Sequence, residues 1–213
     1  MSILYWTLGV ATVLVGVWGG YTKIAEGGLE EPAYTVIESL TEGEIRQYEP
    51  FIVAQTEPSA PGDPGLREGF RVLAGYIFGG NSPNESMPMT APVLQQNKAG
   101  ESLPMTAPVL SHATDMSMAF VMPGNRTLDD LPKPDSDKVT LSQVDMGRVA
   151  AIGFSGRGKQ ARFKKMEATL RAELSARGIQ TTAPALYAQY NSPYAFPLLR
   201  RNEVLISLSA PEQ

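Results

Sequence analysis

The sequence predicts an α+β domain built from two similar halves and preceded by an apolar N-terminal segment. Three observations lead to this prediction. Patterns typical of strands and helices follow the order strand, strand, helix, strands twice along the chain. The sequence PMTAPVL occurs at 88–94 and again, unchanged, at 104–110. Residues 3–21 contain no charged side chain.

The expected strands are stretches rich in β-branched and aromatic residues that are bounded by turn residues. The stretch at 44–56 is expected to turn or bulge near Pro50, because proline removes a donor from the hydrogen-bond ladder. In the second half a short DMG turn separates two strands. The predicted strands cover 34–40, 44–56, 138–144, 148–156, 186–190 and 202–208.

Each half is predicted to contain one amphipathic helix. The first is expected to begin with Asp63 as N-cap and Pro64 at the first helical position, and to stop at Gly79-Gly80. The second covers 160–177 and is followed by Gly178. Apolar residues spaced by three or four give each helix one apolar face. These residues are Leu66, Phe70, Leu73 and Ile77 on the first helix and Phe163, Met166, Leu170 and Leu174 on the second.

The repeated PMTAPVL is interpreted as a pair of strands with irregular pairing. In an extended chain Pro88 and Pro92 have equal parity, so both missing N–H donors lie on the same side of the strand. The same holds for Pro104 and Pro108 in the second copy. We expect the two copies to form a long hairpin through QQNKAGES, with a distorted seam that is able to open into a cleft.

Composition excludes several classes of function. The chain has 213 residues, of which 43% are hydrophobic, enough for one sizeable core. Its net charge is −4 and its 18 Lys and Arg residues form no uninterrupted run, which argues against nucleic acid as a partner. There is no cysteine, so disulfides and thiolate chemistry are excluded. The single histidine, His112, excludes a site with several histidine ligands.

The N-terminal segment is interpreted as a membrane anchor. Residues 3–21 are long enough to cross a bilayer core, and Tyr5, Trp6, Trp18 and Tyr21 bracket them as interfacial aromatics do. No basic residue precedes the apolar stretch and no good cleavage site follows it, so an uncleaved single-pass anchor is favoured over a signal peptide. The expected organisation is an anchor at 1–22, a linker at 23–32 and a domain at 33–210. The domain is expected outside the cytoplasm, as is usual for N-terminal anchors.

Several separated motifs resemble the SOUL haem-binding family. They are the doubled MTAPV, LREGFRVLAGYIFGGN, FVMPGNRTLDDLPKP, YNSPYAFPLLRRNEV and RRNEVLISL, and together they span roughly residues 32–208. The resemblance implies a distorted, mostly antiparallel eight-stranded barrel with two flanking helices and two pseudo-symmetric halves. This fold is similar to bacterial small-molecule-binding domains of the gyrase-inhibitor type. It also implies non-covalent binding of haem or another tetrapyrrole in an open apolar cleft, without enzymatic activity.

The resemblance also implies which residues contact the ligand. Two motifs would line the cleft, the first helix and the loop NSPYAFP near the C-terminus. Arg67 would meet a propionate, and the ring would be contacted by Phe70, Leu73 and Ala74 on the helix and by Tyr194 and Phe196 on the loop. The competing interpretation is that the apolar members of this set belong to the core. His112 is the candidate axial ligand, with an exposed loop histidine as the alternative.

Other interpretations remain open. Hydrolysis of a small hydrophobic compound would need a carboxylate with a raised pKa in the cleft, and Glu68 and Glu203 are the candidates. A membrane-tethered adaptor without a cavity is a further possibility. The stretch GFSGRGK nearly fits a phosphate-binding loop but has Gln160 in place of the hydroxyl residue, so a turn is favoured. In RRNEV, Asn202 or Glu203 is expected to tie the last strand to its neighbour, since buried polar groups need partners.

Overall fold

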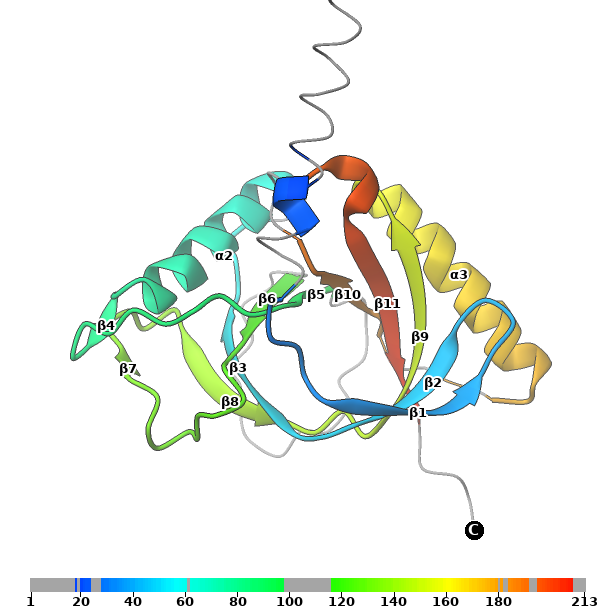
Figure 1. Cartoon of the computed structure of the whole chain (residues 1–213), viewed down its shortest axis with the longest axis horizontal. Coiled ribbons are helices and arrows are strands. Elements are labelled where there is room, and N and C mark those ends of the chain that lie inside the picture. Colours follow the sequence, from blue (N-terminus) through cyan, green and yellow to red (C-terminus); the bar gives the residue numbers. More distant parts are fainter. Residues whose placement is uncertain are drawn as a thin grey trace, which may run out of the picture.

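The computed structural model describes residues 18, 20–23, 28–60, 62–97, 116–179, 181, 184–191 and 195–208. Across this part of the chain, one curled nine-stranded sheet is flanked by two long helices (Figure 1). The sheet consists of β1 (Tyr34–Ser39), β2 (Glu44–Tyr48), β3 (Phe51–Thr56), β5 (Val93–Asn97), β6 (Met116–Val121), β8 (Thr140–Val144), β9 (Arg148–Ser155), β10 (Leu186–Gln189) and β11 (Arg201–Ser207). The remaining elements are the helices α2 (Gly62–Ile77) and α3 (Gln160–Ala176), the short 3₁₀ helix η1 (Pro197–Leu199), and the ribbon of β4 (Asn81–Ser82) and β7 (Lys133–Pro134).

The sheet is antiparallel and its two halves interlock. Its strand order is β1-β2-β9-β11-β10-β5-β6-β3-β8, and the halves meet where β5 pairs with β10. The succession β3, α2, β5, β6 on one side corresponds to β9, α3, β10, β11 on the other. The strand that precedes each succession pairs with the opposite half, because β2 pairs with β9 and β8 pairs with β3. The predicted repeat of strand, strand, helix, strands is therefore confirmed.

Both helices cover the same face of the sheet, α2 over β3 and β6 and α3 over β9 and β11 (Figure 1). Strand alternation divides the apolar residues into three clusters. On β11, Val204 and Ile206 pack beneath α3, whereas Leu205 faces the opposite side of the sheet. The second cluster, on that opposite side, is the one that positions the candidate site. The third lies beneath α2 and includes Leu73 and Tyr76.

The helix predictions are confirmed with small shifts at the ends. The helix α2 begins at Gly62 rather than after Asp63, a difference within the usual scatter of helix boundaries. Gly79 follows α2 with φ of 109° and Gly178 follows α3 with φ of 76°. These backbone angles strain residues that carry a Cβ, so glycine stops both helices as expected.

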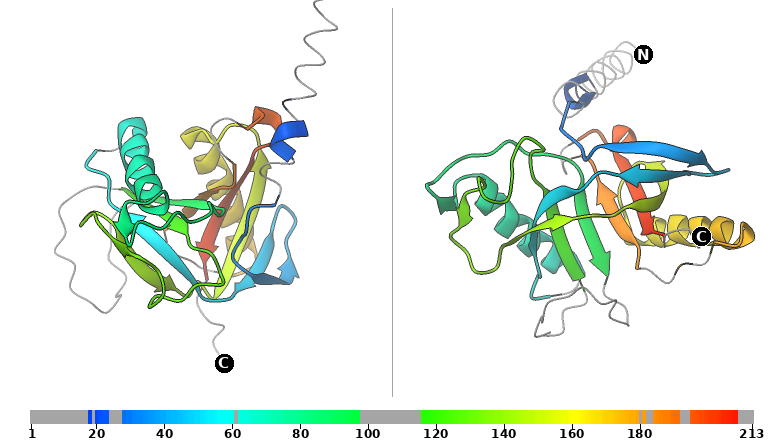
Figure 2. Two further views of the ribbon diagram at one scale, coloured as in Figure 1. Left: turned by 60° about the vertical axis from the view of Figure 1, so that its left-hand side comes forward. Right: turned by 90° about the horizontal axis from the view of Figure 1, so that it is seen from below.

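The expected eight-stranded barrel is corrected to an open half-barrel. In the described part of the chain the sheet has nine strands, and it ends in β1 on one side and β8 on the other (Figure 2). The ninth strand is β1, which pairs with β2 and has no counterpart among the described strands of the other half. A closed barrel would need the two end strands to pair, and each instead pairs along one edge.

The interpretation of PMTAPVL as two paired strands is wrong for the first copy. Residues 88–92 have no strand structure, and β5 begins at Val93 and continues to Asn97, into the predicted linker. The N–H of Ala91 instead donates to the carbonyl of Glu30, outside the sheet. Prolines at 88 and 92 keep the chain off the ladder until Val93, as their missing donors require. The second copy lies outside the described residues.

The described N-terminal residues, 18 and 20–23, are helical and lie at the end of the molecule where α2 and α3 begin (Figure 1). Among the helices that the structure describes, none is long and apolar enough to cross a membrane. Residues 1–17, which make up most of the predicted anchor, lie outside the described part of the chain. The anchor therefore stays a prediction.

Candidate functional site: a covered cavity beside a buried ion network

The predicted contact residues on α2 are mostly part of the core. Leu73 is fully buried beneath the helix, so its side chain is out of reach of a ligand in this conformation. Phe70 is half-buried and meets Phe120 edge-on, with ring centroids 5.3 Å apart. Ala74 is half-buried and Arg67 is exposed. Of the four, Arg67 is therefore the best placed to meet a solute.

The predicted contact residues near the C-terminus are described in part. Phe196 is half-buried and packs edge-on against Trp18, with ring centroids 5.2 Å apart. Its N–H donates to the hydroxyl of Thr22 over 2.9 Å. The rings of Phe70 and Phe196 thus have different partners and belong to separate packing groups. Tyr194 and His112 lie outside the described residues, so their predicted roles stay predictions.

A cavity lies on the other face of the sheet, opposite the helices. The segment 28–33, called here the strap, crosses this face before β1 (Figure 1). It bonds to the first half, because the carboxylate of Glu30 accepts from the N–H of Gly124 over 2.7 Å. The cavity beneath it measures about 10 Å³. Its lining residues are Glu31, Pro32, Tyr34, Tyr48, Phe51, Pro92, Leu94, Met146, Tyr190 and Leu205. Residues 23–32 were predicted to be a linker, and two of them, Glu30 and Glu31, make hydrogen bonds to the rest of the domain.

A buried carboxylate, Glu203 on β11, lies next to this cavity. Arg46 on β2 donates to it twice, Nη1 to Oε2 over 2.8 Å and Nη2 to Oε1 over 3.1 Å. The hydroxyl of Tyr190 donates to Oε2 over 2.6 Å, and Nε of Arg201 donates to Oε1 over 3.1 Å. Arg46 also donates to the hydroxyl of Tyr48 over 3.0 Å. Every oxygen of Glu203 therefore has two donors.

The network continues to the strap and to the rings that line the cavity. Nη1 of Arg201 donates to Oε1 of Glu31 over 2.9 Å, which ties the strap to the second half. The Arg201 guanidinium stacks over the ring of Tyr190, 3.9 Å from its centroid. The Arg46 guanidinium lies 4.3 Å from the centroid of Tyr34. Both contacts are cation–π interactions, so the charges are held by rings as well as by hydrogen bonds.

These contacts fix the protonation state of the network. Burial alone would raise the pKa of the Glu203 carboxyl, but the hydrogen bonds and positive charge of Arg46, with help from Tyr190 and Arg201, hold it below its usual value. Burial also opposes the charge of Arg46, and Glu203 outweighs it, so the pKa of Arg46 is raised. Burial and the charge of Glu203 raise the pKa of the Tyr190 hydroxyl. At neutral pH Glu203 is therefore an ionised carboxylate and the Tyr190 hydroxyl is neutral. At the same pH Arg46 and Arg201 are guanidinium cations.

The chemistry available here is binding and support rather than proton transfer. Among the described residues, no buried side-chain polar atom lacks a hydrogen-bond partner. A carboxylate with a lowered pKa and four donors is a poor general base. The other carboxylate considered for hydrolysis, Glu68, also has a lowered pKa, because the backbone and hydroxyl of Ser59 and the charge of Lys138 favour its ionised form. Neither meets the requirement set for a hydrolase.

Sequence reasoning found part of this site. The expectation that Asn202 or Glu203 ties the last strand to its neighbours is confirmed, since Asn202 donates to the carbonyl of Gly156 over 2.9 Å. Arg46, Tyr190 and Glu31 were missed. The sequence contained one indication of them, the alternation of side chains along a strand. Arg46 and Tyr48 share one side of β2, and Arg201 and Glu203 share one side of β11. A cation at such a position predicts a partner, but the sequence does not say which strand supplies it.

A model of the SOUL heme-binding protein family matches residues 29–207, from the strap to the end of β11. This chain belongs to the SOUL heme-binding protein family. Comparison with curated protein sequences gives no match.

Solved structures share the fold of this SOUL protein. The EcmrR C-terminal domain is similar with a TM-score of 0.54 and 9% identity, over 83% of this chain and 98% of that one. An uncharacterized conserved protein from Listeria innocua is similar with a TM-score of 0.52 and 10% identity, over 88% and 98%. A hydrolase from Listeria innocua is similar with a TM-score of 0.51 and 8% identity, over 89% and 98%. At such low identity the likeness shows the fold alone.

Proposed function

We propose that this SOUL protein binds haem or a related tetrapyrrole reversibly, as a carrier, buffer or sensor, and that its N-terminal segment anchors it to a membrane. The observation that carries the first part is the family match over 29–207, which covers both halves of the domain. The second part rests on the uncharged residues 3–21. The domain is proposed to lie outside the cytoplasm.

The proposed ring position is along α2 and the segment that contains Phe196. Arg67 is exposed on α2 and supplies a cation for a propionate. Phe70 and Ala74, both half-buried, supply apolar contact, and Leu73 supports them from the core. Tyr194 and His112 are proposed as a ring contact and an axial ligand.

The cavity beneath the strap is a poor alternative site for the tetrapyrrole ring in the present conformation. Its volume of about 10 Å³ has room for roughly one water molecule. Pockets that enclose small organic ligands measure about 300–1,000 Å³. A tetrapyrrole would enter there only after the strap had moved and the pair of Glu31 and Arg201 had opened. Arg67 on α2, in contrast, is exposed without such a rearrangement.

A titration of the full-length chain in detergent with hemin tests the proposal. We expect a saturable Soret change at one equivalent, and a several-fold weaker affinity for Arg67→Ala because one charge-assisted contact is lost. Lys133→Ala is the matched control, since it removes an exposed cation on β7. This region meets α2 at its last turn, through Tyr76 and Pro132, whereas Arg67 lies near the start of the helix. A flat titration rejects haem binding. Equal weakening by both variants retains haem binding but rejects the site on α2.

A hydrolase in the same domain is not favoured by a specific observation. Glu203 is held ionised by Arg46, and Glu68 is engaged by Ser59, with its N–H at 3.0 Å and its hydroxyl at 2.9 Å. Both carboxylates act as anchors for neighbouring groups.

A further inference from the structure

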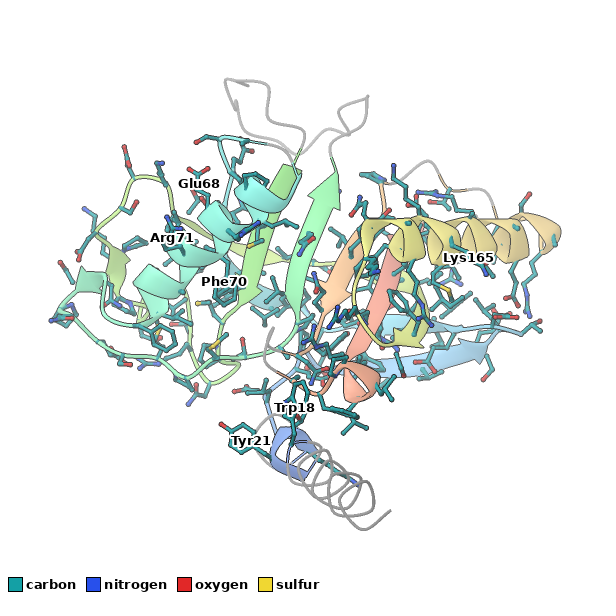
Figure 3. The ribbon with its side chains drawn as sticks, turned by 90° about the horizontal axis from the view of Figure 1, so that it is seen from above. Trp18, Tyr21, Glu68, Phe70, Arg71 and Lys165 are labelled. Carbon is teal, nitrogen blue, oxygen red and sulfur yellow. The ribbon has the colours of Figure 1, made fainter. Side chains whose placement is uncertain are left out.

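The N-terminal helical residues and η1 form one packing unit at one end of the molecule (Figure 1), with Trp18 and Tyr21 next to η1 in Figure 3. Trp18 packs on Phe196, the residue before η1, and the buried hydroxyl of Thr22 accepts the N–H of Phe196. The same hydroxyl donates to the carbonyl of Trp18 over 3.0 Å. Trp18 and η1 therefore lie side by side, so a flat surface that meets one of them at this end also meets the other.

This end of the molecule exposes large apolar side chains. Leu198 on η1 is 73% exposed and Tyr21 is 68% exposed. The described residues include eight exposed large hydrophobic side chains, and half of them lie on this packing unit, namely Trp18, Tyr21, Leu198 and Leu199. Exposed apolar residues that gather in one place mark an interaction surface, whereas single ones need no explanation.

A basic segment adjoins the apolar residues. The N–H of Gly156 donates to the carbonyl of Arg200, directly after η1, over 3.0 Å. From that point residues 157–165 hold five of the chain's 18 basic residues and no acidic one, although the chain as a whole is acidic. They are Arg157, Lys159, Arg162, Lys164 and Lys165, all exposed. Within the described residues, no carboxylate lies within ion-pair distance of these five.

We propose that this end of the domain docks on a bilayer surface with anionic headgroups, with η1 in the interface and residues 157–165 over the headgroups. The end is called here the docking face and comprises Trp18, Tyr21, Leu198, Leu199 and the five basic residues. The inference rests on the proposed anchoring. It adds that the domain is not free on a tether but is held against the lipid in one orientation.

Three features favour lipid over another occupant. The sequence is uncharged from residue 3 to Tyr21, an apolar stretch of bilayer length that ends within this face. Tryptophan and tyrosine are the residues enriched at headgroup level, and the packing of Trp18 on Phe196 places η1 at the level of the tryptophan. A cluster of Lys and Arg next to an apolar anchor is complementary to anionic headgroups.

Because the chain has no cysteine, single labels test the docking directly. The full-length chain carrying Leu198→Cys with a nitroxide label is reconstituted in vesicles of phosphatidylcholine alone or mixed with phosphatidylglycerol. Val36→Cys is the matched control, an exposed aliphatic position on β1 at the opposite end of the molecule (Figure 1). With phosphatidylglycerol we expect the Leu198→Cys label to gain contact with oxygen and to lose contact with a water-soluble nickel complex. The Val36→Cys label stays aqueous in both lipids.

A second variant tests the basic segment. Reversal of three charges, Arg157→Glu, Lys164→Glu and Lys165→Glu, is expected to return the Leu198→Cys label to aqueous accessibility while the protein still floats with the vesicles. A protein that does not float with vesicles rejects the anchoring itself. A floating protein whose Leu198→Cys label stays aqueous in both lipids overturns the docking alone. Spin–spin broadening between labels would show a second copy on this face and would likewise overturn it.

Discussion

Arg46 and Glu203 form a two-point ion pair across a strand that lies between them. Arg46 is on β2, Glu203 is on β11, and β9 separates these strands in the sheet. On the face that the pair crosses, β9 presents Ala151 and Gly153, which are small enough to leave room for the two side chains. The pair thus joins strands that no backbone hydrogen bond connects, next to the cavity beneath the strap.

Glu203→Gln is expected to destabilise the domain strongly. It leaves Arg46 and Arg201 buried or half-buried without their shared counter-charge, and loss of one partner of a buried pair costs about 3–5 kcal/mol. The free energy of unfolding from urea titration measures the effect. Glu44→Gln is the control, because its pair with Arg46 is more exposed and such pairs contribute at most about 1 kcal/mol. Equal losses for the two variants would contradict a special role for Glu203.

The same carboxylate makes stability depend on acid pH. The pKa of Glu203 is lower in the folded than in the unfolded chain, so its contribution is present above the unfolded value, about 4.3, and is lost as the pH falls through the folded value. When the pH is lowered below about 5, we expect the urea concentration at the unfolding midpoint of the natural sequence to decrease. In Glu203→Gln this loss is smaller, and the remainder comes from other carboxylates such as Glu173, whose pKa is also lowered. Parallel pH curves for the two proteins would refute the assignment.

The sequence predicted the order of elements because that order is written in local periodicity. The faces of α2 and α3 are as expected, with Leu73, Ile77, Leu170 and Leu174 buried. The interlocked pairing of β2 with β9 was not predictable, since it depends on contacts between residues about one hundred positions apart. The predicted number of strands was wrong for a different reason, because β1, paired with β2 in a hairpin, adds a strand that the resemblance did not include.

The candidate site was less predictable than the fold. The polar composition of residues 23–32 is typical of a linker, yet Glu30 and Glu31 use their charges to fasten the strap to both halves. Arg46 sits in the short strand EIRQY, where local pattern gives no indication that its partner is Glu203 on β11. The residues proposed to contact the tetrapyrrole were taken from the family resemblance. One of them, Leu73 on α2, is instead buried in the core.

Two glycine variants with opposite expected signs test the backbone packing. A Cβ at Gly43 would overlap the carbonyl oxygen of Ala151 in β9, and backbone cannot yield cheaply, so Gly43→Ala is expected to cost about 1–3 kcal/mol. At Gly75 in α2 a Cβ would meet nothing within 4 Å. Gly75→Ala is therefore expected to stabilise by about 0.5–1 kcal/mol, since alanine is the better helix former. Thermal and urea unfolding of both variants measure these signs, and a stabilised Gly43→Ala would contradict the close approach.

Enlargement of the cavity beneath the strap tests whether the tetrapyrrole binds there, because stability and hemin affinity are expected to respond differently. Leu94 on β5 is buried against this cavity, and Leu94→Ala is expected to cost about 2–5 kcal/mol because it removes packed methyl groups and leaves a larger void. If the ring binds along α2, hemin affinity of the folded variant stays within about twofold, a change of less than half a kcal/mol. The measurement is a hemin titration under conditions where circular dichroism shows that the variant is folded. A large gain in affinity would place the ring beneath the strap instead, because only that space has grown.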